Sequence, residues 1–87
     1  MREREVEAHL IKRVKALGGE VRKVSWIGRN GAPDRFVMLP SGSCWIELKA
    51  PGQKAKPHQV REHERMRAMG QVVLVLDSIA AVDEWFA

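Results

Sequence analysis

Apolar residues recur along this chain with two different spacings, one helical and one typical of strands. Val6, Leu10, Val14 and Leu17 return every three to four residues, which is the stripe of an amphipathic helix, and Gly18 follows as a stop signal. Shorter apolar segments alternate with polar residues or run without interruption, separated by Gly, Pro, Asn and Ser. The predicted elements are a helix over residues 3–17, strands over 21–26, 34–39 and 44–49, a helix over 57–69, a strand over 72–76, and a short last helix capped by Ser78.

The order of these elements, α-β-β-β-α-β-α, predicts an α/β fold with a mixed β-sheet flanked by helices. The second and third strands should form an antiparallel hairpin through a tight turn at residues 40–43, and the helix over 57–69 acts as a crossover into a further strand. We expect the continuous apolar run at 72–76 to be covered on both faces. Residues 1–87 are predicted to form a single domain, because a chain of this length supplies one core.

Charge and composition narrow the class of protein. Apolar residues make up 45% and charged residues 30% of the chain, which is ordinary for a globular protein. No apolar run approaches the roughly 20 residues that span a bilayer, and the mixed-charge N-terminus lacks the apolar core of a signal peptide. The single cysteine, Cys44, has no partner for an internal disulfide. We therefore expect a cytoplasmic protein without a membrane partner.

The basic residues are distributed unevenly along the chain. All 15 Lys and Arg residues lie within residues 1–67, whereas residues 68–87 carry only acidic charges, and the formal net charge is +4. Such a bias suggests a basic surface that faces a polyanion such as nucleic acid. A basic protein without any polyanionic ligand would show the same composition, so the charge alone leaves both interpretations open.

The strand over residues 44–49 carries a carboxylate and an ammonium on one face. Alternation places Glu47 and Lys49 together, and pairing about a four-residue turn should bring Asp34 near Lys49. Two carboxylates this close repel each other, and a divalent cation relieves the repulsion. Lys49 could then orient or help deprotonate an attacking water. The alternative is a structural ion pair of Lys49 with Glu47 or Asp34.

Both long helices carry polar residues on faces that should pack against the sheet. Glu3 and Glu7 fall within the apolar arc of the first helix, and Glu7 is the better placed of the two to reach a metal site. An ion pair within the same helix is the alternative for both. In the helix over 57–69, Gln59 and His63 lie one turn apart, so that Gln59 could orient Lys49 or a water and His63 could contact a phosphate. A buried histidine with a purely structural role is equally compatible with the pattern.

Several basic residues flank this predicted site. Arg29 lies in the loop over residues 28–33, and Lys54 and Lys56 follow the strand over 44–49, so all three are candidates for salt-sensitive phosphate contacts. The arginines of the helix over 57–69 extend this surface or form a solvated face; they are Arg61, Arg65 and Arg67.

The segments GAPDR at residues 31–35 and IELKAPG at 46–52, followed by Gln59 and His63, resemble the PD-(D/E)XK nuclease superfamily. Within it, they are most similar to the VRR-NUC (virus-type replication-repair nuclease) domains. The resemblance implies a restriction-endonuclease-like fold and Mg²⁺- or Mn²⁺-dependent hydrolysis of DNA phosphodiesters. It also implies metal ligation by Asp34, Glu47, the Leu48 carbonyl and Glu7 (directly or through water), and a catalytic role for Lys49 assisted by Gln59.

The resemblance also carries expectations about partners. Minimal stand-alone members of the family, from phages and bacteria, are dimers that act on branched DNA such as four-way (Holliday) junctions. We therefore expect a homodimer in a bacterial or phage-infected cell, without a nucleotide cofactor; candidate interface residues are Trp26, Trp85 and Phe86, for which core packing is the alternative. A less specific or sequence-specific endonuclease, a non-catalytic DNA-binding module, and a structural protein with a hairpin salt bridge remain alternative interpretations.

Overall fold

The predicted elements form in the predicted order in the computed structural model, which describes residues 2–87. They are α1 (Glu3–Ala16), β1 (Glu20–Lys23), β2 (Arg35–Leu39), β3 (Gly42–Leu48), α2 (Pro57–Ala68), β4 (Val73–Leu76) and α3 (Ile79–Trp85). The sheet has the strand order β1-β2-β3-β4, with antiparallel pairs from β1 to β3 and a parallel pair between β3 and β4. The prediction of an α/β fold with a mixed sheet is therefore confirmed.

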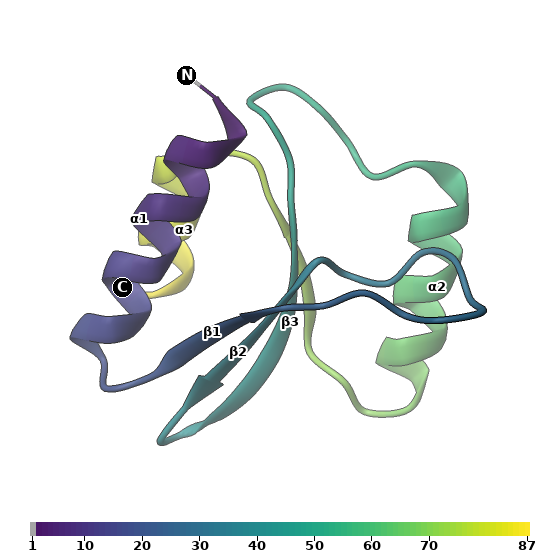
Figure 1. Cartoon of the computed structure of the whole chain (residues 1–87), viewed down its shortest axis with the longest axis horizontal. Helices are drawn as coiled ribbons and strands as arrows, with labels where there is room; N and C mark the ends of the chain where they lie inside the picture. Colours follow the sequence, from purple (N-terminus) through teal and green to yellow (C-terminus); the bar gives the residue numbers. More distant parts are fainter. Residues whose placement is uncertain (1) are drawn as a thin grey trace.

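The hydrophobic core lies on one face of the sheet, beneath α1 and α3 (Figure 1). Alternation along β3 directs Cys44, Ile46 and Leu48 to this face, where they pack with fully buried residues of both helices. The helical members of this cluster are Val6, Leu10 and Val14 of α1 and Val82 of α3. Burial of each such side chain contributes about 1.5–3 kcal/mol, so the α1–α3 face supplies most of the hydrophobic stabilisation.

The opposite face of the sheet is covered by α2 and has a different character (Figure 1). It carries an aromatic cluster in which the Trp45 ring lies 4.5 Å from the Phe36 ring and 6.3 Å from the Trp26 ring, measured between centroids. From α2, His63 and Met66 are buried. Because β3 alternates, this face also receives Glu47, so the two faces separate the aliphatic core from the polar groups.

The β2–β3 hairpin is tighter than we predicted. Its turn consists of Pro40 and Ser41 alone, and Leu39 pairs directly with Gly42. Gly42 has a φ of 142°, a backbone conformation that residues with side chains rarely adopt. This glycine allows the strand to begin two residues earlier than expected. The predicted four-residue turn at 40–43 was wrong, and the observed register continues to place Asp34 opposite residue 47 rather than residue 49.

Two further boundaries differ from the prediction. β1 ends at Lys23 instead of residue 26. The last backbone hydrogen bond to the neighbouring segment is the one that the Asp34 carbonyl accepts from the Val24 N–H at 2.9 Å. Beyond it, the chain crosses toward α2. The apolar run at 72–76 is not covered on both faces: β4 is an edge strand, and Val72 and Val75 remain 43% and 37% exposed. No helix in the described residues is both long and apolar enough to cross a membrane.

Candidate active site

Two carboxylates meet at the end of the β2–β3 hairpin. Asp34 immediately precedes β2, and its Oδ1 accepts a hydrogen bond from the Leu48 N–H at 3.1 Å. Glu47 lies next to Leu48 in β3 and is only 4% exposed. Burial raises the pKa of both carboxyl groups above their ordinary values, and the charge of Asp34 raises the pKa of Glu47 further. The ionised pair is thus unfavourable in the protein without a cation.

Lys49 lies beside this pair but cannot neutralise it. Its Nζ is 3.2 Å from Glu47 Oε2, and its side chain is largely buried. The ammonium group lowers the pKa of both Asp34 and Glu47, but burial outweighs this effect in each case. Arg35 Nη1 also lies 3.7 Å from Asp34 Oδ1, but this guanidinium is shared with Glu7. Two positive charges therefore face three carboxylates, and the local balance is negative.

The Gln59 amide is fixed in one orientation by its two hydrogen bonds. Its Oε1 accepts the Lys56 backbone N–H at 2.8 Å, so its Nε2 is the group that donates to Glu47 Oε2 at 3.2 Å. The other oxygen of that carboxylate, Glu47 Oε1, is buried and has no hydrogen-bond partner among residues 2–87. Leaving such an acceptor unsatisfied costs about 1–3 kcal/mol.

The donor set around Asp34 and Glu47 fits a hard divalent cation. Mg²⁺ and similar ions prefer carboxylate and carbonyl oxygens and retain several waters. A cation would relieve the repulsion between the two carboxylates and give the orphaned Glu47 Oε1 a ligand. Within the described part of the chain, no three His, Cys, Asp or Glu side chains cluster closely enough to hold a metal unaided. The protein therefore offers two carboxylates, and backbone carbonyl, water or substrate oxygens would complete the coordination.

Glu7 reaches the site through Arg35, a contact that the sequence did not suggest. Arg35 Nε donates to Glu7 Oε2 at 2.7 Å, a second guanidinium nitrogen contacts the same oxygen, and Nη1 donates to the Asp34 carbonyl at 2.9 Å. Arg35 thus lies between Glu7 and Asp34, and the partner of Glu7 belongs to β2 rather than to its own helix. Glu3 is exposed, but its charge is close enough to raise the pKa of Asp34.

The remaining candidates occupy three different environments. His63 is 1% exposed, and its Nε2 has no partner in the described structure. Burial lowers its pKa and so favours the neutral ring. Lys54 and Lys56 are exposed in the connection between β3 and α2. Arg29 contacts neither carboxylate of the site, because its guanidinium binds Glu62 on α2 at 2.7 Å.

Glu62 is a buried charged residue that sequence reasoning missed. It is 4% exposed, and its Oε1 accepts hydrogen bonds from both Arg29 and Arg65, each with a shortest distance of 2.7 Å. These two guanidinium groups lower the pKa of Glu62 to about 2. The spacing of three residues between Glu62 and Arg65 was the available signal, but such pairs are common on exposed helix faces.

Comparisons with known proteins cover nearly the whole chain. No family model matches the sequence. A protein described as "Putative nuclease p44", from Acyrthosiphon pisum secondary endosymbiont phage 1, is 48% identical over 79 residues, which is 90% of this chain and 85% of that protein. A solved structure of a VRR_NUC domain is 46% identical, with a TM-score of 0.87, and the match covers 94% of this chain and 90% of the other.

Proposed function

Since the chain belongs to the VRR-NUC nuclease family, as its motifs suggested, we propose that it is a divalent-metal-dependent endonuclease that hydrolyses phosphodiester bonds in DNA. The observation that carries the metal requirement is the pair of half-buried Asp34 and buried Glu47, with an orphaned carboxylate oxygen and a single lysine beside it. Clustered carboxylates oppose a phosphate unless a cation intervenes. A DNA-binding module without catalytic activity would have no need for them.

Each residue of the site has a distinct role in this proposal. Asp34 and Glu47 would hold Mg²⁺ or Mn²⁺, with the Leu48 carbonyl and Glu7, the latter through water, as further ligands. Such an ion lowers the pKa of a bound water and offsets charge on the phosphoryl oxygens. Lys49 is positioned to donate a hydrogen bond to the attacking water or to a phosphate oxygen.

Gln59 maintains the orientation of the catalytic carboxylate. Because the Lys56 N–H fixes its Oε1, the Nε2 donor is always directed to Glu47 Oε2. The exposed Lys54 and Lys56 side chains on the adjoining loop supply sequence-independent attraction to DNA phosphates, which falls as salt rises. His63 is buried on the inner side of α2, where burial favours its neutral form, and we assign it a structural role.

We further propose that the substrate is branched DNA, such as a four-way junction, and that the enzyme acts as a homodimer in the cytoplasm of a bacterial or phage-infected cell. A single site cuts one strand, so symmetric cleavage of a junction requires two copies related by a two-fold axis. Trp85 is 48% exposed and is the best-placed aromatic for such an interface, whereas Phe86 is buried in the core. A free, buried Cys44 suits a reducing compartment.

A cleavage assay tests the proposal directly. The protein is incubated with a labelled four-way junction, a flap and a plain duplex, each with Mg²⁺, Mn²⁺ or EDTA. We expect cutting of the junction in either metal and none in EDTA. Equal cutting of all three substrates would instead support a less specific endonuclease, and cutting restricted to one duplex sequence a sequence-specific one. No cutting in either metal would refute the enzymatic function.

The oligomeric part has its own measurement. Sedimentation at the concentrations used for cleavage should give the mass of a dimer. If only a monomer of 9.9 kDa sediments, with or without DNA, the symmetric mechanism is excluded and the two strands must be cut independently.

A further inference from the structure

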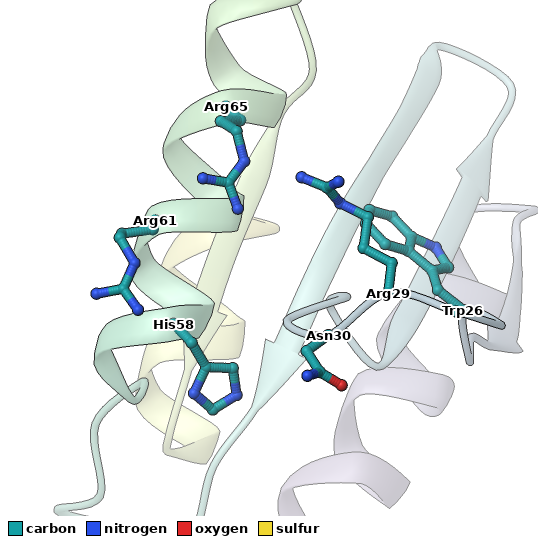
Figure 2. Close-up of a pocket in the computed structure, with 7 residues that line it drawn as sticks. Trp26, Arg29, Asn30, His58, Arg61 and Arg65 are labelled. Carbon is teal, nitrogen blue, oxygen red and sulfur yellow. The ribbon is translucent and has the colours of Figure 1, made fainter.

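A polar pocket of about 490 Å³ lies on the flank of α2, between this helix and the loop over residues 24–34 (Figure 2). Figure 2 shows the two walls: the loop supplies an indole, a guanidinium and an amide, and α2 supplies an imidazole and two guanidiniums. The lining residues are Trp26, Gly28, Arg29 and Asn30 from the loop and His58, Arg61 and Arg65 from α2. None of them belongs to the carboxylate site.

The pocket is positively charged, and the charge is held in place. Arg29 and Arg65 come from opposite walls and are drawn together because both donate to Glu62 Oε1. Glu62 remains ionised, since its pKa is lowered to about 2. No carboxylate among residues 2–87 lies at ion-pair distance from Arg61. Two guanidiniums thus share one carboxylate and the third has none, and an anion with several oxygens, such as a phosphate, complements them.

The indole of Trp26 gives the pocket a second kind of recognition. The ring is held edge-on against Trp45, with an interplanar angle of 83°, so its position on the loop wall is fixed by packing. Planar nucleobases stack on such side chains in proteins that bind single strands. Asn30, on the same wall, offers both a donor and an acceptor. A phosphate alone could accept a hydrogen bond from the Asn30 amide but would not use the face of the indole.

The pocket is connected to the carboxylate site through both of its walls. The loop continues from Asn30 through Gly31 into Asp34, and α2 places Gln59 directly after His58. Gly31 has a φ of 92°, and a Cβ at this position would lie only 2.9 Å from the Glu62 Cβ, so the loop backbone packs tightly against the helix. A DNA strand lying across the carboxylates can therefore continue along these elements into the pocket.

We propose that this pocket binds an unpaired nucleotide of the substrate DNA, with its phosphate on the guanidiniums of Arg29, Arg61 and Arg65 and its base on Trp26. The inference rests on the proposed function, because it presupposes a DNA substrate. An unpaired nucleotide enters such a pocket at little energetic cost, and a pair at a branch point has lost part of its stacking, whereas a fully stacked pair must first be unpaired and extruded. The pocket thereby favours distorted DNA over a regular duplex.

The test compares the binding of two short DNA duplexes in EDTA, where no cleavage occurs. One is perfectly paired, and the other carries a single unpaired nucleotide at its centre; affinities are measured by fluorescence anisotropy. We expect the wild-type protein to bind the bulged duplex on the order of tenfold more tightly. Arg61→Ala and Trp26→Leu should nearly abolish this preference. Trp26→Phe, which keeps an aromatic ring, should retain part of it.

Lys12→Ala is the matched control for charge. Lys12 is exposed on α1, on the other side of the sheet, and its replacement also removes one positive charge. It should weaken binding to both duplexes equally and leave the preference unchanged. An abasic bulge separates the two contacts: its binding should remain sensitive to Arg61→Ala but become insensitive to Trp26→Leu.

Three results would overturn the pocket assignment: no preference in the wild-type protein, an unchanged preference in folded Arg61→Ala and Trp26→Leu, or an equal loss in Lys12→Ala. Thermal melting of each variant establishes that it is folded. Cleavage is measured separately in Mg²⁺ and Mn²⁺. A protein that cuts DNA without preferring the bulge refutes the pocket alone, whereas one that cuts no DNA in either metal refutes the proposed function.

Discussion

Replacing Asp34 by Asn should stabilise the metal-free protein and at the same time remove its ability to be stabilised by a divalent ion. The Asn Oδ1 can still accept the Leu48 N–H, so the hydrogen bond that orients the side chain is retained. What disappears is a partly buried negative charge that repels Glu47. Its attraction to Arg35, whose Nη1 lies 3.7 Å from Asp34 Oδ1, is lost as well and offsets part of the gain. Glu47 and Lys49 are then left as a balanced ion pair.

The expected gain in the free energy of unfolding is on the order of 1 kcal/mol. Relief of an unfavourable charge gives about 0.5–2 kcal/mol, and the weaker hydrogen bond to a neutral acceptor offsets part of it. In a domain of this size, each kcal/mol raises Tm by about 4–8 °C. Addition of metal at one hundred times its Kd should stabilise the wild-type protein by about 2.7 kcal/mol, and Asp34→Asn by much less.

The gain should depend on pH in a defined direction. Because the pKa of Asp34 is raised in the folded state, the native protein binds this proton more tightly than the unfolded chain. The wild-type protein therefore loses stability as pH rises from the ordinary Asp value of 3.8 through the raised pKa. The advantage of Asp34→Asn should be absent below about pH 3.8 and complete once the pH exceeds the raised pKa.

Thermal or urea unfolding in EDTA and in Mg²⁺, at neutral and acidic pH, measures these differences. Asp83→Asn is a control with the opposite sign, because Asp83 is stabilised by a hydrogen bond with His9 at 2.6 Å that lowers its pKa. That variant should lose stability at neutral pH and keep the metal response. A lower Tm of Asp34→Asn in EDTA at neutral pH, or a metal response equal to that of the wild-type protein, would refute the reasoning.

Three other substitutions give independent checks. Lys49→Ala should lower cleavage by at least about a hundredfold while leaving DNA affinity in EDTA intact, and a parallel loss of affinity would contradict a catalytic role. Gly31→Ala should cost about 1–3 kcal/mol in urea unfolding, because its Cβ would lie 2.9 Å from the Glu62 Cβ; unchanged stability would show that the loop can move away from α2. Glu62→Gln should make the free energy of unfolding fall less steeply as the pH is lowered below 4.5. The pKa of Glu62 is depressed to about 2, so its stabilisation is present above pH 4.5 and is lost as pH falls toward 2; an identical fall in both proteins would exclude this contribution.

The fold could be predicted largely because local signals agreed with one another. The helical stripe of α1, the Pro57 start of α2 and the Ser78 cap, whose Oγ accepts the Ala81 N–H at 3.0 Å, all act within a few residues. The failures depended on distant partners. The end of β1 is decided by where β2 begins, and the exposure of Val75 by the position of β4 at the sheet edge.

The carboxylate site was anticipated from alternation and hairpin pairing, which are properties of neighbouring strands. The meeting of Asp34 and Glu47 survived a register error of two residues because both lie at the same end of the hairpin. Arg35, which binds Glu7, and Glu62, which binds Arg29, could not be found in this way. Their partners are separated by 28 and 33 residues and meet only through the packing of helices on the sheet.

The assignment of the aliphatic core to one side of the sheet and of the polar groups to the other has a consequence for how such a protein can diversify. The loop over residues 24–34 and α2 are tied to each other by Gly31 and by the Arg29–Glu62 ion pair, not by the core beneath α1 and α3. Transplanting loop and helix together from a relative should therefore yield a folded chimera with the donor's DNA preference. Transplanting either segment alone should leave Arg29 or Glu62 without its partner where the loop and α2 meet.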